Sequence, residues 1–278
     1  MSEPRWIQAG FTSREGADTL LTAVVGPLVA ELGHDWYFRR GEGDEAQVLL
    51  HVRVLGRRDE DDVRRLVRSR AETPVRFAPD DGELRRYGDG AALAAIERHL
   101  VESSGIALDL LAPGRSAGER HTAAFCLILS AWLAGTHGVR ELDRAIDKGG
   151  APGFGADGSE ERYLRRRSTL DRIASRVRPL ASAADGAVGS TGPVARWAAS
   201  VTALRAALAD EAAAGRFTPS ARGWRGPYGI AGVRNVLTEV DRCAHLICNR
   251  IGVPAEHEAR VRHQAARTVQ EMARSAVH

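Results

Sequence analysis

The chain has 278 residues, 44% hydrophobic and 27% charged, which is enough to bury a large core and argues against a disordered protein. Its formal net charge of +3 is too small to indicate nucleic-acid binding by itself. Three cysteines, Cys126, Cys243 and Cys248, have neither the even number of a disulfide framework nor the spacing of zinc ligands, so we expect a cytoplasmic protein.

The first third of the chain alternates predicted strands with predicted helices. An amphipathic helix is predicted over residues 14–32, with Pro27 bending it, and another over about 59–70 after an acidic start. The glycine-rich turn at 41–44 predicts a hairpin between the strands on either side of it. The predicted strands cover residues 5–11, 35–39, 47–54 and 75–78.

From Gly90 onward the hydrophobic pattern is helical. The predicted helices cover residues 91–103, 118–134, 139–148, 160–177, 193–213, 234–251 and 254–278. This order favours an α+β fold in which a small, antiparallel-containing sheet with helices forms the N-terminal third and helices form the remainder. We expect one domain over 1–278, with an α+β portion to about residue 88 and a helical portion after it. The sequence leaves open whether the two portions are separate domains.

Two classes of partner are not expected. The N-terminus has no apolar segment, and the longest apolar run, 123–134, is too short to span a bilayer, so no export or membrane role is predicted. The basic clusters at 57–58, 64–70 and 165–167 are mixed with acidic residues. They are therefore interpreted as solvated helix faces rather than as a nucleic-acid footprint, although an acidic peptide would match them equally well.

Generic catalytic signatures are absent from the sequence. Four stretches are informative, and they are informative only when taken together. They are Trp6–Phe11, Trp36–Arg40 with Leu50–Val54 after it, Glu83–Gly88, and Ala244–Gly252 followed by Glu258. Over essentially the whole chain, their order and spacing resemble the C-terminal glutamate-elimination domain of lantibiotic dehydratases and its stand-alone relatives in thiopeptide biosynthesis. The matching residues lie in an arginine-bearing strand, an "ExxRYGG" segment and an "HMxxNRxxG" segment, and they are Arg53, Glu83, Arg86, Tyr87, His245, Asn249 and Arg250.

The resemblance implies an enzyme that modifies a ribosomally synthesised precursor peptide, consisting of a leader and a dehydrated core, without a metal or organic cofactor. One activity of the family expels glutamate from a glutamylated Ser or Thr. The other, pyridine synthesis, joins two dehydroalanines by a formal [4+2] aza-cycloaddition and then releases water and the leader peptide. Three departures from the elimination pattern, His51 before Arg53, Gly88-Asp89 and Leu246, weaken carboxylate capture and favour the pyridine synthase.

For that reaction, one dehydroalanine must tautomerise the preceding amide, which requires a proton donor and acceptor. His245 and Tyr87 are the expected pair. Arg53 and Arg86, with Glu83 orienting one of them, are expected to stabilise negative charge. The expected substrate-binding residues are His51, Asn249, Arg250, Trp36 and Arg65.

Several alternatives remain open at this point. His245 could be a core histidine, Arg53 and Glu83 a structural ion pair, and Tyr87 a packing residue. The protein could also be a catalytically silent scaffold for the precursor peptide. An acidic leader is expected near the helix with Arg64, Arg65 and Arg68 and the strand near Trp36. Other pathway enzymes are candidate partners, and a homodimer is left open.

Overall fold

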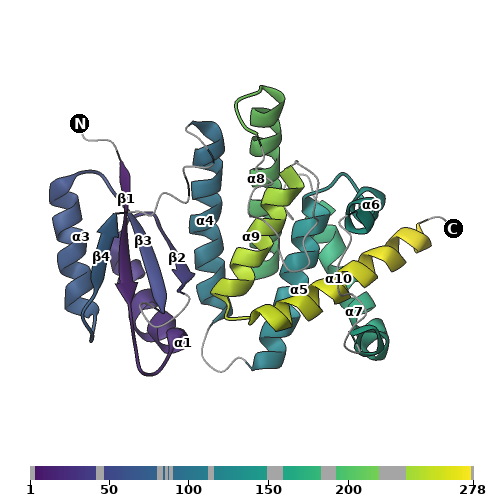
Figure 1. Cartoon of the computed structure of the whole chain (residues 1–278), viewed down its shortest axis with the longest axis horizontal. Helices are drawn as coiled ribbons and strands as arrows, with labels where there is room; N and C mark the ends of the chain where they lie inside the picture. Colours follow the sequence, from purple (N-terminus) through teal and green to yellow (C-terminus); the bar gives the residue numbers. More distant parts are fainter. Residues whose placement is uncertain are drawn as a thin grey trace.

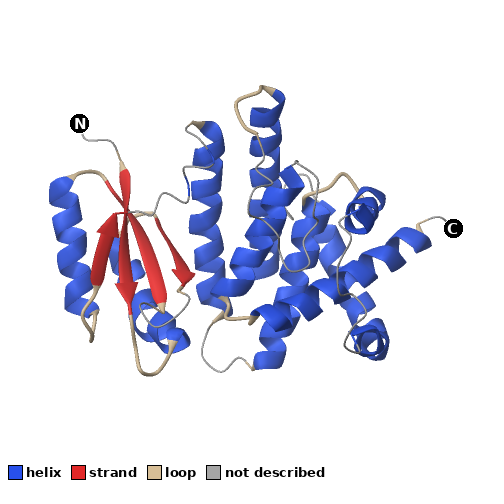
Figure 2. Cartoon of the chain, viewed as in Figure 1, coloured by secondary structure: helices blue, strands red, loops and turns tan. Residues whose placement is uncertain are grey.

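A computed structural model describes residues 4–41, 47–79, 84, 87, 90–111, 116–148, 159–182, 192–218 and 236–276. A small sheet with its helices lies at one end of the molecule, and helices form the rest (Figures 1 and 2). This confirms the predicted α+β class and the order of its two portions. The buried hydrophobic core runs without a break from the sheet into the helices.

The sheet has four antiparallel strands in the order β2-β3-β1-β4. They are β1 (Arg5–Phe11), β2 (Trp36–Arg40), β3 (Val48–Val54) and β4 (Arg76–Pro79). The predicted hairpin of β2 and β3 is confirmed, with Tyr37 opposite His51, while its turn at 42–46 lies outside the described residues. Alternate residues of β3 point to opposite faces, so His51 and Arg53 share one face and the buried Val52 is on the other.

Two helical segments belong to the sheet portion. The helix predicted over 14–32 is divided into α1 (Ala17–Thr19), a π-helical η1 (Leu20–Val25) and α2 (Gly26–Leu32). Pro27 has no backbone N–H to donate to the preceding turn, and a wider π turn lies directly before α2. The bend expected at Pro27 stays a prediction. The second helix, α3 (Arg57–Arg70), packs against β3 and carries Asp59 and Glu60 in its first turn.

Seven helices follow in the described part of the chain. They are α4 (Ala91–Leu110), α5 (Ala117–Ala134), α6 (Val139–Lys148), α7 (Ser159–Ser182), α8 (Pro193–Ala213), α9 (Val236–Arg250) and α10 (Ala255–Ser275). The prediction that the first of them ends at 103 is wrong, because α4 continues through Gly105 to Leu110. Burial against the sheet and α8 outweighs the weak helix propensity of the Ser-Ser-Gly sequence there.

In the described residues no single helix has the length and apolarity needed to cross a membrane. Only α5 and α6 taken together pass such a test, and they are bent by 108° where they meet.

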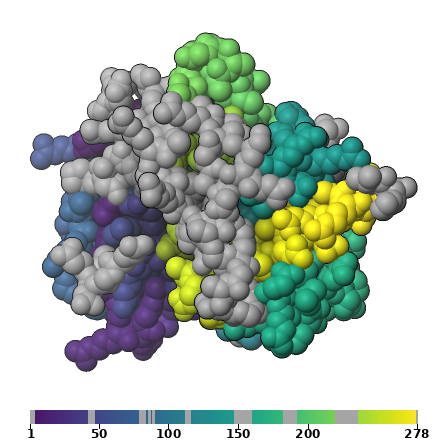
Figure 3. Space-filling view, turned by 45° about the vertical axis from the view of Figure 1, so that its right-hand side comes forward, coloured from purple at the N-terminus to yellow at the C-terminus, as the bar shows by residue number. Residues whose placement is uncertain are grey.

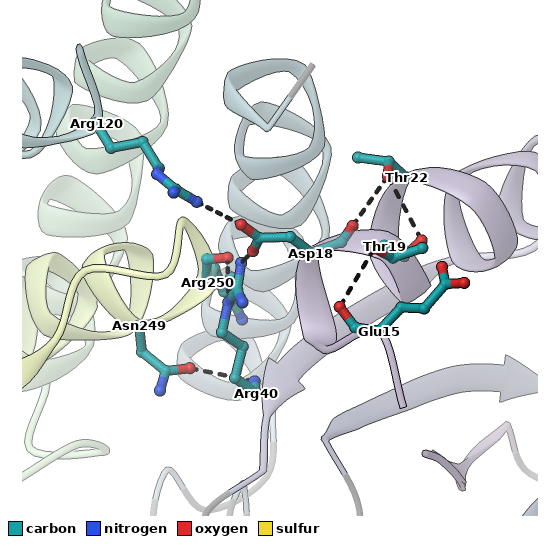
Figure 4. A network of polar contacts seen from close by, with 8 residues as sticks. All are labelled: Glu15, Asp18, Thr19, Thr22, Arg40, Arg120, Asn249 and Arg250. Carbon is teal, nitrogen blue, oxygen red and sulfur yellow. Dashed lines mark hydrogen bonds and ion pairs between the residues drawn. The ribbon is translucent and has the colours of Figure 1, made fainter. Parts of the chain in front are cut away.

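Arg40 on β2 connects the sheet portion to the helical portion (Figure 4). Its guanidinium donates to Asp18 of α1 at 2.5 Å and to the backbone carbonyl of Arg250 at 2.9 Å. Its backbone N–H donates to Oδ1 of Asn249, and Arg120 of α5 reaches the other oxygen of Asp18. The network fixes the end of α9 against the sheet, and so it sets where the polar residues of α9 lie.

Candidate functional site

Tyr87 meets the first turn of α9 in a buried polar group of three residues. The Tyr87 hydroxyl donates to Oε2 of Glu239 at 3.1 Å, and the Arg242 guanidinium donates to the same oxygen at 2.6 Å. All three side chains are almost completely buried. In this site the carboxylate is stabilised by two donors, and the Tyr87 hydroxyl has an acceptor placed next to it.

His245 lies on α9, where most side chains are buried, but its own side chain is about one-third exposed. Its Nδ1 donates to Oε2 of Glu258 at 2.8 Å, and Oε1 of Glu258 accepts from Nε of Arg262 at 2.7 Å. Arg262 also pairs with Asp241, which accepts the indole N–H of Trp132. The charges behind His245 are thus paired and hydrogen-bonded, which fixes one side of an imidazole whose ring reaches solvent.

Arg53 lies at the mouth of a different space. A cavity of about 700 Å³ is bounded by the sheet, α4 and α8, and Arg53 lines it with Trp6 and Glu97. The indole N–H of Trp6 donates to Glu97 at 2.7 Å. Arg53 lies 3.5 Å from Asp35 and 4.0 Å from the second oxygen of Glu97. The volume is within the range of about 300–1,000 Å³ that is usual for small-ligand pockets.

An edge-on aromatic pair separates this cavity from the Tyr87 group. The ring centroids of Trp6 and Tyr37 are 4.9 Å apart, and Tyr37 also stacks on the fully buried His51 at 4.3 Å. Beyond Tyr37 lies a space of only about 10 Å³ next to Tyr87 and Leu246, about the size of one water. The structure therefore places Arg53 on one side of the Trp6–Tyr37 pair and Tyr87 on the other.

The remaining described candidates are bound to other parts of the protein, or lie apart from this site. Arg250 is buried and donates to the Phe38 carbonyl at 2.6 Å and to the Ser103 hydroxyl at 2.6 Å. Asn249 accepts from the backbone of β2, as Figure 4 shows. Trp36 is half-buried on β2, and Arg65 is exposed on α3, paired with Asp62 at 3.0 Å.

Two predicted residues, Glu83 and Arg86, lie outside the described residues. The described acids near Arg53 are Asp35 and Glu97 instead. Sequence reasoning missed Glu239, Arg242 and Glu97 because nothing in a helical pattern shows that a charged residue is buried. The helix α9 is as rich in charged residues as the rest of the chain, yet it packs against α4, α5, α8 and the sheet, and only that packing shows that its charges are buried.

Burial determines the protonation of two groups near the site. It lowers the pKa of His99 on α4 to about 3, with a further contribution from Arg250, so that this ring is neutral at pH 7. Burial raises the pKa of the Cys248 thiol well above its usual value, and Glu258 adds to the effect. Cys248 is consequently no thiolate nucleophile.

Comparisons with known proteins give one family and a common fold. The family model described as "Lantibiotic biosynthesis dehydratase C-term" matches residues 6–269. The crystal structure of TsrL is similar with a TM-score of 0.68 at 18% identity, over 98% of this chain and 95% of that one. The pyridine synthase TbtD from thiomuracin biosynthesis gives 0.68 at 17% identity, over 96% and 98%.

A third similar structure is the tRNA-dependent lantibiotic dehydratase MibB from Microbispora sp. 107891. Its TM-score is 0.57 at 20% identity, and the match covers 99% of this chain but 29% of that one. A search of the curated proteins found no match. All three structural likenesses are below 25% identity, so they bear on the fold alone.

Proposed function

This chain belongs to the lantibiotic biosynthesis dehydratase C-terminal family, whose members modify ribosomally made precursor peptides, and on that premise we propose that it is a pyridine synthase. The proposed reaction joins two dehydroalanines of the core peptide in a formal [4+2] aza-cycloaddition. Loss of water and of the leader peptide then gives an aromatic pyridine. TbtD, which shares the fold, is a pyridine synthase.

The supporting observation is that three described arginines of the site, Arg53, Arg242 and Arg250, already have partners within the protein, whereas Arg98 at the cavity forms no ion pair with a described residue. Arg242 pairs with Glu239 at 2.6 Å, and Arg53 lies between Asp35 and Glu97. Arg250 is bound to the Phe38 carbonyl and to Ser103. Glutamate elimination releases a dicarboxylate that free guanidinium groups would best hold. A neutral dehydropeptide has no such requirement, which favours the cyclase.

In this proposal the Tyr87 group acts on the amide that becomes the 2-azadiene. The Tyr87 hydroxyl turns from Glu239 and transfers its proton to the amide oxygen, while Glu239 takes the proton from the amide nitrogen, which gives the imidic acid. Glu239 then returns that proton to the Tyr87 oxygen, which restores both residues. Arg242 holds the Glu239 carboxylate in place through their 2.6 Å ion pair. The remaining acceleration comes from holding both alkenes in near-attack geometry, an effect worth about 7–11 kcal/mol in well-oriented reactions.

His245 is assigned a separate step. It lies six residues after Glu239 on α9, a rise of about 9 Å, so it serves a different end of the substrate from Tyr87. With Nδ1 fixed by Glu258, the imidazole can transfer a proton during loss of water and the leader peptide. Arg53, Trp6 and Glu97 would then bind backbone groups of the core peptide in the 700 Å³ cavity.

The test is mass spectrometry of two separate incubations of the purified protein. One contains a leader-bearing peptide with two dehydroalanines, and the other contains a peptide with glutamylated serines. The proposal expects loss of water and of the leader from the first peptide, with a new pyridine absorbance, and no change in the second. The Tyr87→Phe variant, incubated in parallel, should form little of the product.

Two other outcomes would contradict the proposal. Loss of the glutamate mass from the second peptide, with the first unchanged, would identify a glutamate-elimination lyase. Binding of both peptides without any product, with affinity unchanged in the Tyr87→Phe and His245→Gln variants, would identify a non-catalytic scaffold.

A further inference from the structure

A basic pocket lies on the side of α10 that faces away from His245. Its volume is about 200 Å³, and helices α5, α7 and α10 supply its walls. The lining residues are His121, Arg162, Arg165, Arg166, Arg260 and Gln264. Figure 3 shows α7, teal-green at the lower right, beside the yellow α10 on the surface of the helical portion. The side chains of four arginines thus line one pocket.

Three of these arginines are not neutralised by their neighbours. Among the described residues, only Arg165 of the four forms an ion pair, with Glu161 at 2.5 Å. Arg162, Arg166 and Arg260 form none within the described ranges. The arginines also act on His121, whose pKa is lowered by burial and by the charges of Arg166 and Arg260. The pocket therefore holds about three units of positive charge without a bound counter-charge in the protein.

The basic cluster on α3 differs in this respect. Arg64 pairs with Glu60 at 2.6 Å, and Arg65 pairs with Asp62 at 3.0 Å. The guanidinium groups of Arg64 and Arg68 stack on Phe77, at 4.8 and 5.0 Å from the ring centroid. The cluster that the sequence favoured for an acidic leader is thus largely satisfied within the protein, whereas the pocket between α7 and α10 is not.

We propose that this pocket is a docking site for an acidic segment of the precursor peptide, remote from the reacting residues. Carboxylates of Asp or Glu side chains would accept bidentate hydrogen bonds from Arg162, Arg166 and Arg260. Gln264, which is hydrogen-bonded to His121 at 3.3 Å, supplies a neutral donor at the floor. The assignment rests on the proposed function only for the identity of the partner, a peptide.

The size and surroundings of the pocket favour a peptide over a nucleic acid. A volume of about 200 Å³ accommodates one or two side chains and is below the usual range for a whole small ligand. Acidic residues precede its arginines on the same helix, Glu160 and Glu161 in the first turn of α7. A continuous phosphate backbone would meet these carboxylates, but a short acidic motif would not.

The test is fluorescence anisotropy with a fluorescein-labelled peptide of eight glutamates, which contains no dehydroalanine and so does not depend on the chemistry. The Arg162→Gln/Arg166→Gln/Arg260→Gln variant should bind it at least about tenfold more weakly than the native protein, equivalent to about 1.4 kcal/mol. The control variant, Arg64→Gln/Arg65→Gln/Arg68→Gln, removes the same charge from α3 and should bind within about twofold of the native protein. Thermal unfolding of both variants confirms that each remains folded.

Three results would overturn this site. Equal weakening by the two triple variants would mean that binding follows net charge alone, and failure of the native protein to bind the peptide would remove the site altogether. Tighter binding of a labelled eight-nucleotide RNA, with an affinity that falls steeply with salt, would assign the pocket to nucleic acid. Binding as expected, combined with no product from the dehydrated peptide, would refute the pyridine synthase and leave the docking site in place.

Discussion

His245 and Glu258 form an imidazole–carboxylate pair in which Nδ1 and Oε2 are 2.8 Å apart, with the histidine one-third exposed and the glutamate almost fully buried. The second oxygen of Glu258 is bound to Arg262, which is itself paired with Asp241. A partly exposed imidazole held from behind by a buried carboxylate is a common arrangement for a proton-transferring histidine. The helix α10 therefore contributes to the site by supplying Glu258, which holds His245 of α9.

The first prediction distinguishes two roles of Glu258, orienting the His245 ring and stabilising the folded protein. We expect Glu258→Gln to lower kcat for formation of the pyridine product by about tenfold or more, because Gln holds the His245 ring less firmly for proton transfer. Asp241→Asn is the matched control, since it also removes a carboxylate from Arg262 but leaves His245 untouched. Both variants should lose stability in urea denaturation. Equal loss of kcat per folded protein in the two would show that Glu258 acts only structurally.

The second prediction concerns the Tyr87 hydroxyl. Tyr87→Phe should reduce the rate of product formation on the order of 100-fold, because it removes the group that would donate to the substrate amide. Tyr163→Phe provides the control: Tyr163 is also buried, and its hydroxyl has no hydrogen-bond partner among the described residues. That variant should keep its activity. A Tyr87→Phe protein with native kinetics would exclude Tyr87 from the mechanism.

A third prediction follows from the neutral His99 within the core. Its pKa is about 3 in the folded protein, because of burial and then Arg250, against about 6.5 in the unfolded chain. As the pH falls below 6.5 the unfolded state takes up the proton first, so the free energy of unfolding decreases by up to about 1.4 kcal/mol per pH unit. Urea titrations at pH 7.0, 5.5 and 4.5 should show a shallower decline for His99→Gln. Parallel declines for the two proteins would contradict a neutral buried His99.

The fourth prediction compares two glycines in the helical portion. A Cβ at Gly135 would lie 2.8 Å from Cδ1 of Leu237 and 3.0 Å from the Ala131 carbonyl oxygen, so Gly135→Ala should cost about 1–3 kcal/mol where α5 meets α9. At Gly105, inside α4, a Cβ would meet nothing within 4 Å. Gly105→Ala should therefore raise stability by about 0.5–1 kcal/mol through helix propensity. Thermal unfolding of the pair measures the difference, and a destabilised Gly105→Ala would disprove the packing described for α4.

The sequence by itself determined most of the secondary structure, and the residues that it suggested for the site stay predictions. Periodicity of apolar residues is local, and it predicted the strands and helices with ends that mostly lie within a few residues of those observed. The exception, α4, continues past Ser103 because distant segments bury it. The resemblance singled out Tyr87, Arg53 and His245 before any contact was visible.

Only the tertiary structure decided what each polar residue contacts. Glu239 and Glu258 became visible as partners of Tyr87 and His245 because the chain brings α9 beside both the segment before α4 and the start of α10. The same packing commits Arg250 to the backbone of β2. Burial and long-range pairing depend on how helices are placed in three dimensions, and a one-dimensional pattern of charges does not contain that placement.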